Sequence, residues 1–141
     1  MAVMVNQLDG EAIITDCVKS GFVANTIKFA NDFGQSLARN DLSTSQIRNV
    51  YGEVKRIQMK GEDNTAFETE ILLLKPKLMY AKVRGQKTTA KNAMGDLATV
   101  LSKGIDTVFE LETRKEQFER FERFAAFFEA VIAYHRAAGG K

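Results

Sequence analysis

The chain has 141 residues, and its 20 lysines and arginines against 18 aspartates and glutamates give a formal net charge of +2. A chain of this length is expected to form one domain over residues 1–141 with a single core, while 45% hydrophobic residues and one proline exclude a disordered or collagen-like protein. Its apolar runs are shorter than the roughly 18 residues of a membrane span, and its start lacks the pattern of an export signal, so we expect a cytoplasmic protein without membrane contact.

Two helices are predicted before residue 40. The first is short, with Asp9 placed to cap it and Gly21 to end it. The second runs from about residue 25 to residue 39, and Gly34 within it permits close approach to another helix. The predicted inward-facing residues are Ile13, Ile14, Cys17 and Val18 in the first helix, and Ile27, Phe29, Ala30, Phe33 and Leu37 in the second. We therefore expect the single cysteine, Cys17, to be a reduced thiol in the core.

A third helix is predicted to start at a capping box, Ser43-x-x-Gln46, in which the serine hydroxyl accepts a hydrogen bond from a free backbone N–H and the glutamine reaches back. Its apolar residues repeat with helical spacing until Gly61 ends it. They are Ile47, Val50, Tyr51, Val54 and Ile57. A second capping box, Thr65-x-x-Glu68, is predicted to begin the next helix.

Residues 71–84, ILLLKPKLMYAKVR, are apolar on nearly every side. This pattern predicts a central helix with packing partners on more than one side. Pro76 is expected to bend this helix without ending it, because proline has no N–H to donate to the carbonyl of residue 72. Gly85 is predicted to be the stop.

Two more helices complete the predicted fold. One starts at Thr88 or Thr89, and the last follows a third capping box, Thr113-x-x-Glu116, and ends near Ala137. Their predicted core residues are Ala93, Met94, Leu97, Val100, Leu101, Ile105, Val108 and Phe109, and then Phe118, Phe121, Phe124, Phe128 and Ile132. Because strand patterns are absent, the predicted fold class is all-α, a single compact bundle of five to six helices.

Little in the sequence points to catalysis. One histidine and one cysteine cannot form a His/Cys metal cluster, and no glycine-rich loop follows a strand to hold a nucleotide, so no catalytic residue, metal site or cofactor is predicted. His135, near the end of the last helix, is expected to bond terminal carbonyls or interact with the helix dipole. Surface ion pairs four residues apart are expected between Glu116 and Arg120 and between Glu119 and Arg123.

Basic residues form the clearest functional pattern. Residues 71–95 contain six lysines or arginines and no acidic residue, and three more bases lie on the preceding helix. Such a surface indicates an anionic partner, most commonly a nucleic-acid backbone. Tyr80, on the same helix line as Lys77, is placed either to stack on a base or to pack in the core. The predicted RNA-binding residues are Arg48, Lys55, Arg56, Lys75, Lys77, Tyr80, Lys82, Arg84, Lys87 and Lys91.

Three segments, LSTSQIRNVYGEV, LLKPKLMYAKVRG and FERFAAFFEAVIAYHR, resemble in order and spacing the signatures of the small helical subunit of type III-A CRISPR (Csm) interference complexes. This resemblance, over residues 42–136, implies a non-catalytic bundle that repeats along the complex as its inner filament, beside backbone subunits that hold the guide RNA and cut the target. The implied partners are the guide-RNA-containing complex with its backbone and large subunits, the target RNA, and copies of the same chain. The residues it marks as RNA-facing are Arg48, Lys55, Lys75, Lys77, Tyr80 and Arg84.

Charge and resemblance agree on a mechanism in which guide pairing recognises sequence and this chain supplies positive charge to the RNA backbone without base preference. Two alternatives stay open. Residues 43–57 could be the recognition helix of a DNA-binding regulator, which predicts a preference for duplex DNA. A helical adaptor without nucleic acid would instead dock neighbours through its acidic last helix and its basic 71–84 helix, and would assemble without RNA.

Overall fold

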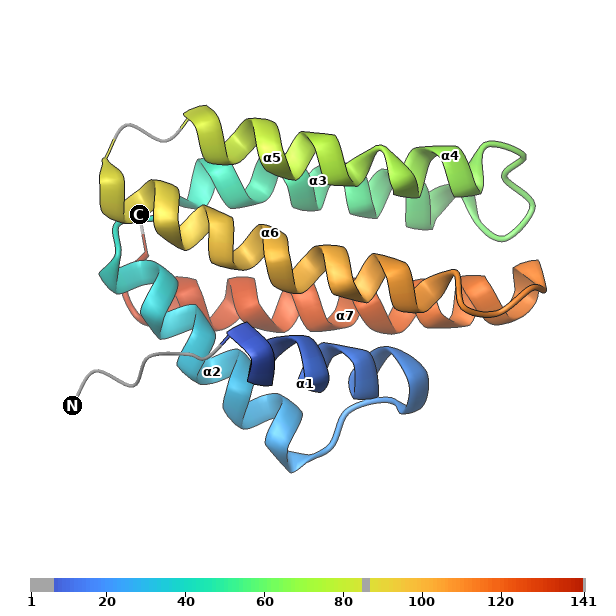
Figure 1. Cartoon of the computed structure of the whole chain (residues 1–141), viewed down its shortest axis with the longest axis horizontal. Coiled ribbons are helices and arrows are strands. Elements are labelled where there is room, and N and C mark those ends of the chain that lie inside the picture. The colour runs from blue at the N-terminus through green and yellow to red at the C-terminus, as the bar shows by residue number, and fades with distance from the viewer. Residues whose placement is uncertain (1–6, 85–86, 141) are drawn as a thin grey trace.

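The computed structural model describes residues 7–84 and 87–140, which form seven helical segments and no strand (Figure 1). Their bounds are α1 Gln7–Ser20, α2 Ala24–Arg39, α3 Thr44–Lys60, α4 Phe67–Leu72, α5 Leu74–Arg84, α6 Thr88–Val108 and α7 Arg114–Ala137. Only Leu73 separates α4 from α5, and the two lie end to end as one bent helix, so the described part has six helices. The predicted all-α bundle of five to six helices is confirmed.

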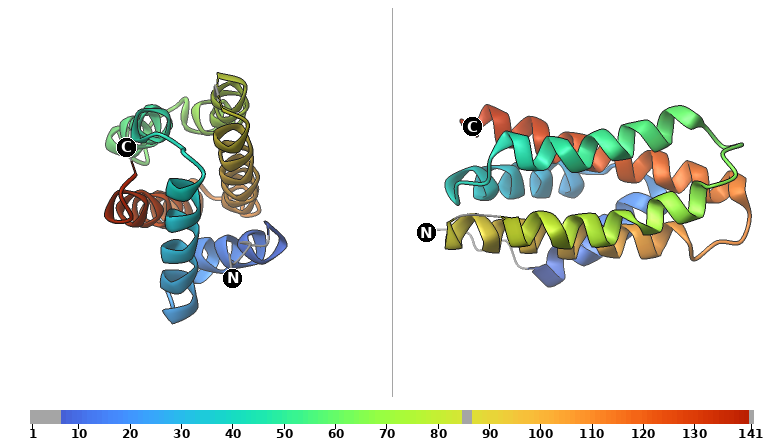
Figure 2. Two further views of the ribbon diagram at one scale, coloured as in Figure 1. Left: turned by 90° about the vertical axis from the view of Figure 1, so that its left-hand side faces the viewer. Right: turned by 90° about the horizontal axis from the view of Figure 1, so that it is seen from above.

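The last helix, α7, is the centre of the bundle, because α1, α2, α3 and α6 all pack against it (Figures 1 and 2). Phe121, Phe124 and Phe128 of the predicted stripe are buried, but so are Phe127 and Val131, which the predicted stripe omitted. A helix with neighbours on several sides buries more than one stripe. The sequence analysis assigns this helix a single buried face, and its list of core residues is incomplete for that reason.

The segment predicted to be central, residues 71–84, lies at the edge of the bundle, so this prediction is wrong. Its buried residues, Ile71, Leu74 and Leu78, form one stripe that packs toward α3 and α6. Its other large apolar side chains face outward and are 42% to 71% exposed; they are Leu72, Leu73, Met79, Tyr80 and Val83. Apolar periodicity reports a preference for burial, and only the positions of the other helices decide which faces are covered.

The predicted bend at proline is confirmed. The helix is interrupted at Leu73, and the ladder resumes where the N–H of Lys77 donates to the carbonyl of Leu73 at 3.3 Å. Pro76 has no N–H for the carbonyl of Leu72, and its ring crowds that turn, which places the irregularity before the proline. The predicted stop at Gly85 lies outside the described residues.

Two of the three capping boxes begin helices as predicted. The hydroxyl of Ser43 accepts from the N–H of Gln46 at 3.2 Å, and that of Thr113 accepts from the N–H of Glu116 at 3.3 Å. At Thr65 the prediction is wrong. There α4 begins at Phe67 after a turn built on Asn64, whose side-chain oxygen and carbonyl accept from Ala66 and Phe67 at 3.0 and 3.1 Å.

The start of α1 differs from the prediction, whereas α6 starts at Thr88 as predicted. Asp9 lies inside α1 and therefore does not cap it. The cap position of α6 is Lys87, which makes no side-chain capping bond, and Thr88 is the first helical residue.

Close packing of α2 on α7 explains the glycine inside α2. A Cβ atom on Gly34 would lie 2.7 Å from both the backbone nitrogen of His135 and the Cβ of Tyr134. Hence the predicted close approach at Gly34 is confirmed. Ile27, predicted to face inward, is instead 41% exposed, because α2 reaches beyond α7 at its first turns (Figure 1).

Two arginines of α7 tie neighbouring helices to the centre. Arg123 donates to the carbonyls of Val18 and Lys19 at 2.8 and 3.1 Å, and Arg120 donates to the carbonyl of Thr107 at 2.7 Å. These carbonyls belong to the last turns of α1 and α6, where the helix leaves acceptors unpaired. The predicted surface pairs with Glu116 and Glu119 are wrong, since both arginines bind backbone carbonyls of neighbouring helices.

The remaining fold predictions concern the core thiol and the membrane. Cys17 is fully buried, and burial raises the pKa of its thiol to about 11, against a smaller lowering by Arg123. A low-pKa, reactive thiol is thus excluded at this position. Within the described ranges, every helix is too short or too polar to span a membrane.

Candidate nucleic-acid interface

Several of the predicted RNA-binding bases have acidic partners in other segments of the chain. On α5, Lys75 pairs with Asp106 of α6, and Lys77 pairs with Glu53 of α3. Arg56 reaches both Glu53 at 3.2 Å and Glu70 at 2.7 Å, and Lys87 lies 3.7 Å from Asp41. The lack of acidic residues in the 71–95 segment therefore does not leave its charges unopposed. The opposing carboxylates come from parts of the chain far away in sequence.

Glu70 is the anchor of the cluster that joins α3 to α4. Its carboxylate accepts from Asn64 at 2.7 Å and pairs with Arg56 and Lys60 at 2.7 and 3.2 Å. The hydrogen bond from Asn64, followed by that from Arg56, lowers its pKa from 4.5 to about 2. The charge on Glu70 thus stabilises the fold at neutral pH.

A pH dependence follows from Glu70. Because its pKa is lower in the folded chain, its contribution is fully present above pH 4.5 and is lost as the pH falls toward about 2. We expect Glu70→Gln to reduce stability at neutral pH and to make stability fall less steeply as the pH drops below 4.5. Urea denaturation at a series of pH values measures both effects. Glu68→Gln, two residues away and exposed, should keep the steep dependence of the parent. Equal pH slopes for Glu70→Gln and the parent would contradict this assignment.

Four predicted bases form no ion pair with any described residue: Arg48, Lys55, Lys82 and Lys91. Arg48, Lys82 and Lys91 are exposed, and the stem of Lys82 lies against Gly95 of α6. Lys55 is bonded to Gln58, at 3.2 Å. The side chain of Arg84 lies outside what the structure describes. Arg48, Lys82 and Lys91 are accordingly the predicted positions best placed to meet an added anion.

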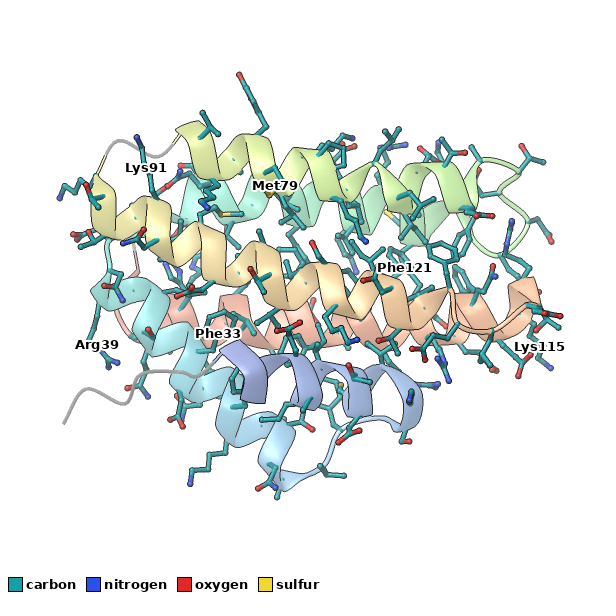
Figure 3. The ribbon with its side chains drawn as sticks, viewed as in Figure 1. Phe33, Arg39, Met79, Lys91, Lys115 and Phe121 are labelled. Atoms are coloured by element: carbon teal, nitrogen blue, oxygen red, sulfur yellow. The ribbon has the colours of Figure 1, made fainter. Side chains whose placement is uncertain are left out.

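The exposed bases gather at one end of the bundle, where the C-terminal ends of α2, α5 and α7 meet the N-terminal ends of α3 and α6 (Figures 1 and 3). We call this the basic end; its exposed cations are Arg39, Arg48, Lys82, Lys87, Lys91 and Arg136. Two carboxylates, of Asp41 and Asp96, lie among the same turns. Such an excess of one sign on a rigid surface attracts polyanions.

The opposite end carries the opposite sign. The loops that connect α3 to α4 and α6 to α7 lie there, where Figure 3 shows Lys115. Its exposed acids are Glu62, Asp63, Glu68, Glu110, Glu112 and Glu116, which outnumber the exposed Lys19, Lys60 and Lys115 at the same end. A net charge near zero thus hides a charge separation along the bundle. Arg39 and Arg136, which the sequence analysis did not select, belong to the basic end because the C-terminal ends of α2 and α7 both lie there.

A groove of about 720 Å³ opens beside the basic end, between the first half of α3, the α5 helix and the start of α6. Val50, Ala81 and Ala90 supply apolar lining, and Ser45 and Asn49 supply polar lining. Predicted residues Lys77, Tyr80 and Lys87 also line it. Tyr80 is 64% exposed, which excludes the interpretation that it packs in the core.

His135 has a structural position. Its ring is fully buried, and Nε2 lies 2.6 Å from the carbonyl oxygen of Leu42, at the connection between α2 and α3. Gly140 packs directly against the ring. His135 therefore has the structural role that was predicted, but the predicted bond to terminal carbonyls of its own helix is wrong, because the carbonyl belongs to Leu42. In the described part of the chain, no cluster of His, Cys, Asp and Glu is arranged to hold a metal ion.

The family model described as Csm2 Type III-A matches residues 22–141. The matched region runs from α2 to the end of the chain, so it contains the basic end, the groove and all ten predicted RNA-binding positions. It extends the resemblance at residues 42–136 by the whole of α2. No curated protein and no solved structure matches the chain.

Proposed function

The chain belongs to the Csm2 Type III-A family and is thus a small subunit of a type III-A CRISPR (Csm) complex, within which we propose that it binds the RNA backbone without reading sequence. The proposed ligand is the target RNA, alone or paired with the guide. The proposed partners are the backbone and large subunits that carry the guide RNA and further copies of this chain. In this proposal its role in antiviral defence is non-catalytic and cytoplasmic.

The observation that carries the proposal is the basic end. Five helices contribute exposed cations to one end of the molecule, while most exposed acids of the loops lie at the other. A phosphate backbone binds such a surface through release of its counterions. Among the cations there, Arg48, Lys82 and Lys91 can meet a phosphate without first breaking an ion pair with a described residue.

Sequence-blind binding follows from the same chemistry. Contacts from lysine and arginine to phosphates fix the position of a strand and carry no base information, while pairing with a guide supplies the specificity. Packing of α2, α3 and α6 on α7, and of α5 on α3 and α6, holds the cations at fixed spacing along the strand.

The DNA-regulator alternative receives no support from the position of α3. This helix lies between α5 and α7, and its residues Tyr51 and Glu53 are bonded to Glu129 and Lys77 of those neighbours. A recognition helix must project to enter a major groove. In this structure α5 and α7 cover two flanks of α3.

The proposal predicts a specific salt dependence. Changing Arg48, Lys82 and Lys91 together to alanine should leave the bundle folded, weaken binding of single-stranded target RNA, and reduce the slope of log affinity against log salt by about 2, since each phosphate neutralised on a single strand contributes about 0.7. Fluorescence anisotropy across a salt series measures both quantities.

The matched control changes Lys28, Lys103 and Lys115 to alanine, which removes the same charge away from the basic end. Arg120 and Arg123 are unsuitable controls because they bind the ends of α6 and α1. A control variant that loses as much slope would contradict the location of the site. A parent chain that assembles into the complex but shows no salt-sensitive RNA binding would favour the adaptor alternative.

A further inference from the structure

The groove beside the basic end is built from three helices, and we infer that it holds one unpaired nucleotide of the bound RNA, with the base inside and the phosphate at the rim. This inference rests on the proposed RNA-binding function and adds a base-sized site to it. The groove volume of about 720 Å³ lies within the range of small-molecule clefts and leaves room for a nucleotide. Its lining combines apolar walls with a few polar groups, as such clefts do.

Unused hydrogen-bonding groups line the α3 side of the groove. The side chains of Ser45 and Asn49 form no hydrogen bond within the described chain. By contrast, Ser43 and Gln46, which also line the groove, are occupied by the cap of α3. A carboxamide offers two donors and an acceptor, which match the edge of an unpaired base. Asn49 is therefore placed to bond a base, and its mixed donors and acceptor tolerate more than one base type.

The α5 side offers a ring and a flat apolar surface. Tyr80 lines the groove with a side chain that is 64% exposed, and Pro76 and Ala81 of the same helix also line it. Bases stack on aromatic rings with little sequence preference. A base between Tyr80 and Asn49 would thus be held by stacking on one side and by hydrogen bonds on the other.

Charges decide which part of a nucleotide enters. Inside the lining the charges cancel, because Lys77 is paired with Glu53 and Lys87 with Asp41. A neutral base suits this interior better than a phosphate does. At the rim, Lys87 is half of a long, exposed pair, and such pairs are easily exchanged for another anion. The groove also continues onto the basic end, so a phosphate at this rim meets the same cations as the rest of the strand.

The test compares Tyr80→Ala with Tyr80→Phe in the full chain, using a single-stranded oligouridylate and fluorescence anisotropy across a salt series. We expect Tyr80→Ala to weaken binding about tenfold through loss of stacking, with the salt slope of the parent, because no charge is removed. Tyr80→Phe keeps the ring and should bind like the parent. Asn49→Ala should weaken binding by a smaller factor. Met79→Ala, the neighbouring exposed residue outside the lining, is the matched control and should have no effect.

The outcomes test the pocket separately from RNA binding at the basic end. Parental affinity for Tyr80→Ala, in a parent that binds with a steep salt slope, would overturn the pocket and leave the proposed function intact. A parent without salt-dependent RNA binding would overturn the proposed function itself. An equal loss in Met79→Ala would move the contact to the outer face of α5 and overturn the pocket. Photocrosslinking of thiouridine-substituted RNA to Tyr80 in the assembled complex would support the pocket, and crosslinks of that RNA to this chain that all lie outside the groove would overturn it.

Discussion

Replacing Phe127 by alanine is expected to lower the free energy of unfolding by about 3 to 5 kcal/mol, as much as Phe128→Ala. Both side chains are fully buried in α7, where Phe127 stacks near Phe29 with ring centroids 6.2 Å apart and Phe128 meets the edge of Tyr51 at 5.4 Å. Truncation would remove these contacts and leave a cavity where α7 meets α2 or α3, because packed helices close such a space only in part. Urea denaturation followed by far-ultraviolet circular dichroism measures the loss.

Phe127 makes this experiment discriminating, because the stripe inferred from the sequence omits it. A helix buried on one face alone would tolerate Phe127→Ala with a loss below about 1 kcal/mol. Phe22→Ala is the control, since Phe22 lies before α2 and is 37% exposed. We expect it to lose far less than Phe127→Ala. Equal, small losses at both positions would contradict the central position of α7.

Changing glycine to alanine is expected to have opposite effects on stability in two helices. At Gly34 the added Cβ would lie 2.7 Å from the backbone of His135 and 2.8 Å from the carbonyl oxygen of Val131. These atoms belong to the backbone of α7 and cannot rotate away, so α2 and α7 must separate. We expect a loss of about 1 to 3 kcal/mol, the usual range for overpacking.

At Gly52 of α3 there is no atom within 4 Å of an added Cβ, and the position is exposed. Alanine is favoured over glycine inside a helix, so Gly52→Ala should raise stability by up to about 1 kcal/mol. Thermal unfolding of the two variants and the parent decides the comparison. A stabilising Gly34→Ala would mean that α2 does not approach α7 as closely as this structure has it.

The packing around α7 also affects function, because α7 holds the elements of the candidate interface in place. The first half of α3 forms one wall of the groove, and it is attached to α7 by the contact of Tyr51 with Phe128 and Glu129. Arg39, at the end of α2, is positioned by the helix that packs through Gly34. We therefore expect Phe128→Ala to weaken RNA binding indirectly, whereas Gly52→Ala should leave RNA binding unchanged.

Local sequence was sufficient for the features that depend on a few neighbouring residues. Ser43 and Thr113 begin helices because each hydroxyl accepts a hydrogen bond from the backbone N–H three residues later. The bend before Pro76 follows from the covalent structure of proline. The three quoted segments also indicated the family, because the family is recognised by the order and spacing of such segments. The all-α class follows from periodicity summed over many residues.

Tertiary structure alone decided which helix is central, which charges are paired and where the cations gather. Residues 71–84 are as apolar as a core helix, yet only the positions of α3 and α6 determine that Met79 and Val83 stay exposed. Lys75 and Lys77 have partners more than twenty residues away, which no window along the chain includes. Arg39 and Arg136 lie at the same end because the C-terminal ends of α2 and α7, far apart in sequence, both lie there. Burial, ion pairing and surface charge are properties of faces that meet in space, and the order of residues along one helix does not specify them.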